Sequence, residues 1–145
     1  MALSIYDKLR SGVTTSSAEE TRALAAELGA ALPADTTLAL HGNLGVGKTT
    51  FVQGLARGLG VTDAITSPTF NIFSLHRGPT RLIHLDAYRL DHARQIEDLL
   101  LTDFLETPWC LAIEWPERID DWVPPGALHV ELGITADEQH TIRLR

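Results

Sequence analysis

One segment restricts what this chain can fold into more than any other, and it comprises residues 41–50, HGNLGVGKTT. Within it, residues 42–49 fit the phosphate-loop pattern GxxxxGK[ST]. The apolar run at residues 36–40 predicts a buried strand before the loop, and a helix is expected from about Lys48 to Gly58 after it. This order of strand, glycine-rich turn and helix is the context that the pattern requires, so it disfavours a chance match.

Each part of this loop has a chemical reason. Glycines allow the backbone to wrap closely, so that successive N–H groups point at an anion. Lys48 can reach the outer phosphates of a nucleotide and the Thr49 hydroxyl can ligate Mg²⁺, while the helix that begins here adds its positive dipole end. We therefore expect a nucleotide to contact Gly42, Asn43, Leu44, Gly45, Val46, Gly47, Lys48, Thr49 and Thr50.

Two acidic residues each follow an apolar strand. Residues 82–85 lead to Asp86, and residues 110–113 lead to Glu114. The carboxyl ends of strands form the edge where open α/β sheets bind ligands, and Mg²⁺ at phosphate-loop sites needs carboxylates held there. One acid is expected to ligate the metal and the other to orient the attacking water, with both assignments open. The expected catalytic residues are Lys48, Asp86 and Glu114, and the expected metal ligands are Thr49, Asp86 and Glu114.

Three further features accompany these motifs. In the segment at residues 66–70, TSPTF, Ser67 and Thr69 offer hydroxyls where many nucleotide hydrolases have a loop that senses the γ-phosphate. An ordinary Ser/Pro turn is the alternative interpretation. Trp115 follows Glu114 and is expected to cover the site and contact the nucleotide. His84 is either a hydrogen-bonded core residue or part of the site.

Elsewhere helices and strands alternate. Helices are expected over residues 17–32 and 96–105, strands over 70–76, 81–85 and 109–113, and a closing hairpin over 128–134 and 141–144. Residues 1–12 are expected to be a loosely ordered extension. The alternation predicts an α/β fold of the P-loop NTPase type: a three-layer sandwich with a mixed, mainly parallel central sheet and a C-terminal hairpin. No linker divides the sequence, so a single domain is expected over residues 1–145.

The charge balance excludes one class of protein. The chain has 12 Lys and Arg against 19 Asp and Glu, a formal net charge of −7, whereas autonomous nucleic-acid binders usually carry a basic stripe. If the protein acts on RNA, a partner would therefore have to provide the RNA-binding surface. The only cysteine, Cys110, lies in an apolar run and is expected to be an inert buried thiol. No apolar run is long enough to span a membrane, and the cytoplasm is the expected location.

Taken together, the motifs resemble one family, the TsaE (YjeE) ATPases, which take part in the threonylcarbamoyladenosine modification of tRNA. The resemblance runs from about Val13 to the C-terminus and depends on the order and spacing of four motifs. These are residues 42–50 (GNLGVGKTT), 67–70 (SPTF), 84–89 (HLDAYR) and 113–117 (IEWPE). One position departs from the family pattern, because Asn43 stands where the family usually has Asp.

The resemblance implies roles for the matching positions. Lys48 and Thr49 would bind phosphate and Mg²⁺, Ser67–Thr69 would form a first switch, Asp86 would be the Walker-B-type acid, and Glu114 a metal ligand with Trp115 beside it. The implied function is ATP binding and hydrolysis that supports formation of the threonylcarbamoyl group on an adenosine of tRNAs reading codons that begin with adenine. TsaB and TsaD would be the partners, and tRNA would be contacted only through them. Separately, the ATPase is expected to be slow alone, because no obvious arginine finger lies near the phosphate motifs in the sequence.

Two other functions remain open at this point. A small-molecule kinase uses the same fold, although the chain has no Arg-rich lid-like cluster after Ile113. A nucleotide-sensing module with negligible hydrolysis is the second alternative, and the paired carboxylates disfavour it because binding alone does not need a second acid. A GTPase is disfavoured because the guanine-reading Asn-Lys-x-Asp motif is absent.

Overall fold

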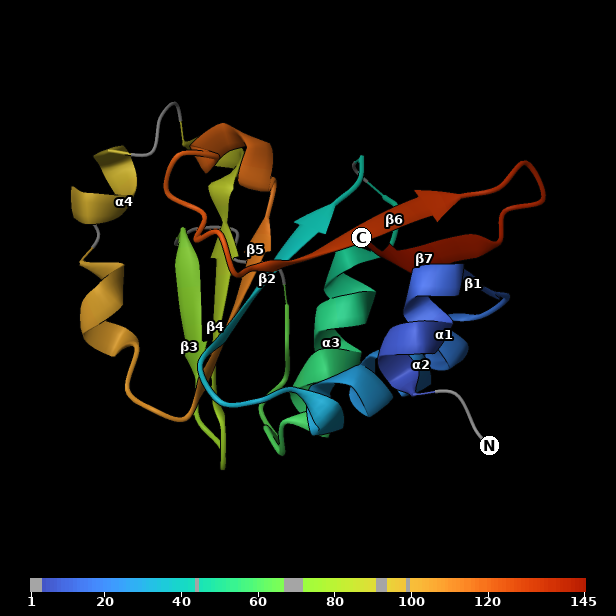
Figure 1. Ribbon diagram of the computed structural model, residues 1–145, viewed down its shortest axis with the longest axis horizontal. Coiled ribbons are helices and arrows are strands. Elements are labelled where there is room, and N and C mark those ends of the chain that lie inside the picture. Colours follow the sequence, from blue (N-terminus) through green and yellow to red (C-terminus); the bar gives the residue numbers. More distant parts are fainter. Residues whose placement is uncertain (1–3, 44, 67–71, 91–93, 99) are drawn as a thin grey trace.

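The computed structural model of the protein describes residues 4–43, 45–66, 72–90, 94–98 and 100–145. The described strands form a seven-stranded sheet in the order β1-β7-β6-β2-β5-β4-β3 (Figure 1). These strands are β1 (Val13–Thr15), β2 (Thr36–His41), β3 (Phe73–His76), β4 (Arg81–Asp86), β5 (Trp109–Glu114), β6 (Leu128–Ile134) and β7 (His140–Leu144).

The centre of the sheet is parallel and its edges are antiparallel. Strand β2 pairs in parallel with both β5 and β6, and β4 pairs in parallel with β5. The pairs β1–β7, β6–β7 and β3–β4 are antiparallel. This confirms the predicted mixed sheet and the C-terminal hairpin, which β6 and β7 form.

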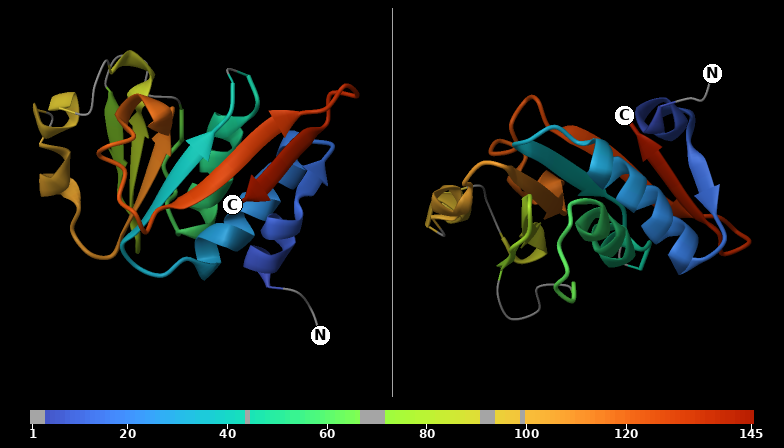
Figure 2. Two further views of the ribbon diagram at one scale, coloured as in Figure 1. Left: turned by 45° about the horizontal axis from the view of Figure 1, so that its top comes forward. Right: turned by 90° about the horizontal axis from the view of Figure 1, so that it is seen from below.

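Helices and short 3₁₀ turns cover the sheet. The helices are α1 (Ile5–Ser11), α2 (Ala18–Ala31), α3 (Lys48–Gly58) and α4 (Arg94–Asp98), and the turns are η1 (Ala87–Arg89), η2 (Leu101–Phe104) and η3 (Pro116–Ile119). Helices α2 and α3 lie side by side under one face of the sheet (Figure 2). Among the described residues, no helix combines the length and apolar character needed to cross a membrane.

The sheet separates two apolar clusters, as expected for a three-layer sandwich. One lies between the sheet and α2 and α3, and includes Leu38, Leu40 and Phe51. The other contains Ile83, Leu111 and side chains of the short helices that cover the opposite face. Because side chains alternate along a strand, the even-numbered apolar residues of β2, β4 and β5 belong to the first cluster, and the odd-numbered apolar residues of β4 and β5 belong to the second. This alternation decides which strand residues reach the site.

The helix predicted at residues 17–32 is present as α2. The Ser17 hydroxyl oxygen accepts a hydrogen bond from the Glu20 backbone N–H at 3.1 Å, which is the N-cap contact that the sequence indicates. The Glu20 carboxylate reaches one residue further back than the usual capping box, and accepts from the Ser16 backbone N–H at 2.7 Å. The start of this helix could therefore be predicted from the spacing of Ser17 and Glu20.

The N-terminal segment differs from the expectation of a loosely ordered extension over residues 1–12. Residues Ile5–Ser11 form helix α1, whose N-cap Ser4 accepts from the Asp7 backbone N–H at 3.1 Å. Ile5 and Leu9 are buried in the first apolar cluster. They lie four positions apart and so share one face of the helix, a pattern too short to weigh heavily in the sequence.

The single helix predicted over residues 96–105 is wrong. The chain forms α4 and then η2, and Leu100 between them has a φ of 53°, which a right-handed helix cannot accommodate. Ile96 and Leu101 are each only 1% exposed. In one continuous helix, two residues five positions apart point in directions that differ by about 140°. The break between α4 and η2 therefore allows both side chains to pack into the second cluster.

Candidate functional site

The residues predicted to carry the chemistry meet at the carboxyl edge of the parallel strands. Strand β2 ends at His41 and leads into the phosphate loop, defined as residues 42–49, and then into α3. Glu114 ends β5 and Asp86 ends β4. Glu114 is the register partner of both Leu40 and Asp86, so the three strand ends stand level. The sheet thus brings the loop and the two acids to one edge.

A cavity of about 310 Å³ opens at this edge. Its lining combines the start of α3 with the ends of two strands: Gly45, Gly47, Lys48, Thr49, Thr50, Asp86, Tyr88, Glu114 and Trp115. The predicted residues Lys48, Thr49, Asp86, Glu114 and Trp115 are therefore brought together. Tyr88 also lines the cavity, although no role was predicted for it.

The backbone of the phosphate loop has the conformation for which glycine is needed. Gly47 has a φ of 94° and forms the N-cap of α3, in a left-handed conformation that residues with a side chain seldom adopt. A Cβ at Gly42 would lie 2.6 Å from the Leu132 carbonyl oxygen of β6. The motif glycines therefore shape the turn and allow it to lie against the neighbouring strand. Helix α3 then points its free backbone N–H groups toward the cavity.

The Lys48 ammonium group is held inside the loop. Lys48 is 5% exposed, and its Nζ donates to the Gly42 carbonyl oxygen at 2.8 Å. The same Nζ lies 3.7 Å from the centroid of the Trp115 ring, a cation–π contact. Burial lowers the pKa of Lys48, and the nearby carboxylates of Glu114, Glu117 and Asp86 partly oppose this effect. An anionic ligand would add to that opposing influence and favour the charged amine.

Trp115 lines the cavity beside Lys48, so it lies where a cover over the site was expected. It has a φ of 57°, which turns the chain sharply at the end of β5. Its ring contacts Tyr88 with centroids 5.0 Å apart, and the Arg118 guanidinium carbon lies 5.2 Å from the Tyr88 ring centroid. Lys48, Trp115, Tyr88 and Arg118 thus form a continuous stack at the cavity, built from α3, η1 and η3.

The two acids are held differently. Glu114 is 5% exposed, and its Oε2 lies 2.5 Å from His84 Nε2. Asp86 is more accessible, and its Oδ1 accepts from the Tyr88 backbone N–H at 3.0 Å, which caps η1. His84 is fully buried, so it is both a hydrogen-bonded core residue and a neighbour of the site. Because His84 and Asp86 lie two apart on one strand, they share a face.

The donors present fit a hard divalent cation. Two carboxylates and the Thr49 hydroxyl are oxygen ligands, which Mg²⁺ prefers. Within the described ranges, no cluster of three or more His, Cys, Asp or Glu side chains is arranged to hold a metal. Mg²⁺ is usually bound through one or two carboxylates together with substrate phosphates, and this site has that composition.

Some of the predicted nucleotide-contact residues do not line the cavity, and others fall outside the described ranges. Asn43 is exposed, whereas Val46 is buried and Thr50 is half-buried beside the cavity. Leu44, Ser67 and Thr69 lie outside the described residues, so the predicted first switch stays a prediction. Cys110 is buried, and burial raises the pKa of its thiol to about 12, which agrees with an inert cysteine.

Two histidines support the loop in ways that the sequence did not indicate. His140 of β7 has Nδ1 3.1 Å from the Val46 carbonyl oxygen, so the C-terminal hairpin contacts the phosphate loop. His41 has Nε2 2.8 Å from His129 Nδ1, which joins the end of β2 to β6. Both contacts bridge residues about ninety positions apart, and only the strand order β7-β6-β2 reveals them.

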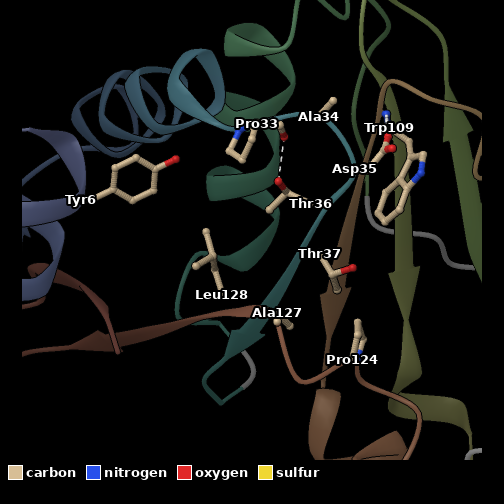
Figure 3. A pocket seen from close by; sticks show the side chains of 11 residues that line it. Tyr6, Pro33, Ala34, Asp35, Thr36, Thr37, Trp109, Pro124, Ala127 and Leu128 are labelled. Atoms are coloured by element: carbon tan, nitrogen blue, oxygen red, sulfur yellow. Dashed lines mark hydrogen bonds between the residues drawn. The ribbon is translucent and has the colours of Figure 1, made fainter.

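A second cavity of about 500 Å³ lies at the opposite edge, beside the starts of β2, β5 and β6 (Figure 3). Two of its polar side chains form hydrogen bonds within the protein. The Thr36 hydroxyl donates to the Pro33 carbonyl oxygen at 2.7 Å, and the Asp35 carboxylate accepts from the Trp109 backbone N–H at 3.2 Å. The lining is otherwise mostly apolar, and it lacks the cations and paired acids of the phosphate-loop cavity.

Comparison with known proteins gives consistent similarities. Residues 15–143 match the family described as threonylcarbamoyl adenosine biosynthesis protein TsaE. The chain is 34% identical to the tRNA threonylcarbamoyladenosine biosynthesis protein TsaE of Treponema pallidum, covering 87% of this chain and 93% of the relative. It is 35% identical to the protein of the same name from Bacillus subtilis, covering 86% and 78%.

A solved structure is also similar. The crystal structure of Bacillus subtilis YdiB aligns with a TM-score of 0.76 and 30% sequence identity. The alignment covers 90% of this chain and 81% of that one. The sheet and the helices that position the cavity therefore follow an arrangement that has been observed experimentally.

Proposed function

This chain belongs to the TsaE family of threonylcarbamoyl adenosine biosynthesis proteins, and from that premise we propose that it binds and hydrolyses ATP with Mg²⁺ at the phosphate loop. The observation that best supports the proposal is the shared cavity, which Lys48, Thr49, Asp86 and Glu114 all line. Positive charge, a hydroxyl and paired acids at the N-terminus of a helix are what phosphoryl transfer requires.

Each residue has a distinct part in the proposed reaction. Lys48 would contact the outer phosphates, and the N-terminal N–H groups of α3 would surround them. Thr49 and Glu114 would hold Mg²⁺, which neutralises phosphate charge when it is bound. Glu114 is favoured over Asp86 for this role because β5 is the direct neighbour of β2, the strand that carries the loop. Asp86, one strand further out, would orient the attacking water.

We propose that hydrolysis serves tRNA modification through partner proteins. The names of the relatives refer to tRNA threonylcarbamoyladenosine biosynthesis, and the net charge of −7 favours an accessory ATPase over a protein that grips RNA itself. The partners would be TsaB and TsaD in the cytoplasm, with tRNA contacted only through them. The ATPase would then act on the complex that carries the tRNA.

The fate of the γ-phosphate tests this proposal. ATP labelled on the γ-phosphate should release inorganic phosphate in the presence of Mg²⁺, slowly with this protein alone and faster with TsaB and TsaD. Lys48→Ala serves as the inactive control. Transfer of the label to a small metabolite would indicate a kinase instead, and retention of the label on ATP under all conditions would indicate a nucleotide-sensing module.

A further inference from the structure

His84 is the most deeply buried polar side chain near the site. It is 0% exposed and lies in β4, where its register partner is Ala112 of β5. Because Glu114 follows Ala112 by two residues on the same strand face, the two side chains meet across the β4–β5 pair. Their closest atoms, His84 Nε2 and Glu114 Oε2, are 2.5 Å apart.

The surroundings of the ring indicate which nitrogen donates. A carboxylate oxygen is an acceptor, so the hydrogen of this bond is assigned to Nε2. The second ring nitrogen, Nδ1, is buried and has no hydrogen-bond partner among the described residues. The geometry therefore corresponds to an Nε2–H group that donates to the Glu114 carboxylate.

This contact fixes the Glu114 carboxylate. With Oε2 held by His84, rotation of the carboxylate would break a buried hydrogen bond. The other oxygen, Oε1, accepts no hydrogen bond from any residue that the structure describes, while Glu114 lines the phosphate-loop cavity. One oxygen is thus tied to the core and the other is left for a ligand.

We infer that His84 is a positioning residue that acts through Glu114: it orients the carboxylate so that Oε1 meets the magnesium of a bound nucleotide. The inference rests on the proposed function. Stability alone is a weak reason for this pair, because a well-packed apolar side chain in place of a buried polar pair is often neutral or stabilising. Partners that orient a ligand in this way typically contribute about 10–100-fold to metal affinity.

Two matched substitutions test the inference. Gln can place an N–H group near the position of Nε2, whereas Asn reaches only the position of Nδ1. The Mg²⁺ concentration that half-saturates binding of a non-hydrolysable ATP analogue should rise about 10–100-fold in His84→Asn. In His84→Gln most of that rise should be absent. The affinity for the nucleotide without Mg²⁺ should be unchanged in both variants, since the phosphate loop is intact.

The same titrations in a Glu114→Gln background complete the design. There, neither His84 variant should shift the Mg²⁺ requirement further, because the group on which His84 acts has been replaced. Unfolding temperatures measured alongside show whether each variant folds. If His84→Asn does not fold, His84→Ala takes its place: a rise of about tenfold or more in the Mg²⁺ requirement that His84→Gln does not show supports the inference, and a requirement within threefold of wild type overturns it.

Different results separate the inference from the proposed function. A wild-type chain that binds no nucleotide overturns both. A wild-type chain that binds nucleotide with Mg²⁺, together with a folded His84→Asn variant of unchanged Mg²⁺ requirement, overturns only the role of His84. Nitrogen NMR of the wild-type protein is a further check on the tautomer. A hydrogen on Nε2 is expected, and a ring that carries its only hydrogen on Nδ1 would contradict the proposed hydrogen bond.

Discussion

The two acids of the site are one strand apart, yet their surroundings give them different tasks. Glu114 is buried beside His84 and adjoins the strand of the phosphate loop, whereas Asp86 is more accessible. We expect Glu114→Gln to raise the Mg²⁺ concentration needed for half-maximal ATP hydrolysis. Asp86→Asn should lower the maximal rate with little change in that concentration. A Mg²⁺ titration of the hydrolysis rate measures both, and the reverse pattern would show that the roles are exchanged.

Site residues could be predicted from the sequence where neighbouring residues form a recognisable motif. Lys48 and Thr49 stand in one contiguous motif, and Asp86 and Glu114 each end an apolar run. The pairing of His84 with Glu114 depends on the register of β4 against β5, which no local pattern encodes. Tyr88 joins the lining from η1, the short turn that follows Asp86. Contacts across strands therefore required the structure.

At the scale of elements, the close packing of α2 on α3 depends on glycine. A Cβ at Gly54 would lie 2.6 Å from Arg22 Cα and 2.8 Å from Ala25 Cβ of α2. Ala normally favours a helix over Gly by about 1 kcal/mol. Here displacement of the backbone dominates, since overpacking costs about 1–3 kcal/mol. Gly54→Ala should therefore lower the free energy of unfolding.

Chemical denaturation of Gly54→Ala and a matched control measures this effect. Gly126→Ala is the control, because a Cβ there would meet nothing within 4 Å. Its free energy of unfolding should stay within about 0.5 kcal/mol of wild type. Equal stability of wild type and Gly54→Ala would contradict the packing described for α2 and α3.

Elements were predictable where one clear signal dominated. The N-cap at Ser17, the glycine turn before α3 and the alternation in β6 and β7 each mark an element. Helix α1 was missed because its buried face consists of Ile5 and Leu9 alone. The break at Leu100 was missed because Ile96 and Leu101 are buried by tertiary packing, and a 3.6-residue period treats their segment as one helix.

For the whole molecule, the net charge of −7 and the pairing of its cations argue against direct RNA binding. Positively charged side chains that form ion pairs with acids include Lys8, Arg10, Arg22, Arg57, Arg81 and Arg145. We expect the isolated chain to bind tRNA weakly or not at all at about 0.15 M salt, where the Debye length is about 8 Å.

Fluorescence titration of labelled tRNA measures this binding, with and without the proposed partners TsaB and TsaD. Association should appear only when they are present. Sub-micromolar binding by the isolated chain would reveal a basic face assembled from scattered residues such as Arg77 and Arg89, and would favour a direct role in RNA handling.

The rate of ATP hydrolysis is also expected to depend on the partner proteins. No arginine lines the phosphate-loop cavity among the described residues. A missing transition-state cation costs about 10³–10⁵ in rate in related phosphoryl-transfer enzymes. Steady-state phosphate release should therefore be slow for the protein alone and rise when its partners are added. Rapid turnover that partners leave unchanged would show that the chain supplies its own catalytic cation.

The central claim is that the cavity at the phosphate loop binds ATP through Lys48, and calorimetric titration of ATP into wild type and Lys48→Ala with Mg²⁺ tests it most directly. A charge-assisted contact to phosphate contributes about 1.5–3 kcal/mol, so the substitution should weaken affinity about 10- to 100-fold. Unchanged unfolding temperature would show that the fold is intact. Equal ATP affinity in the two proteins would contradict the assignment of the site.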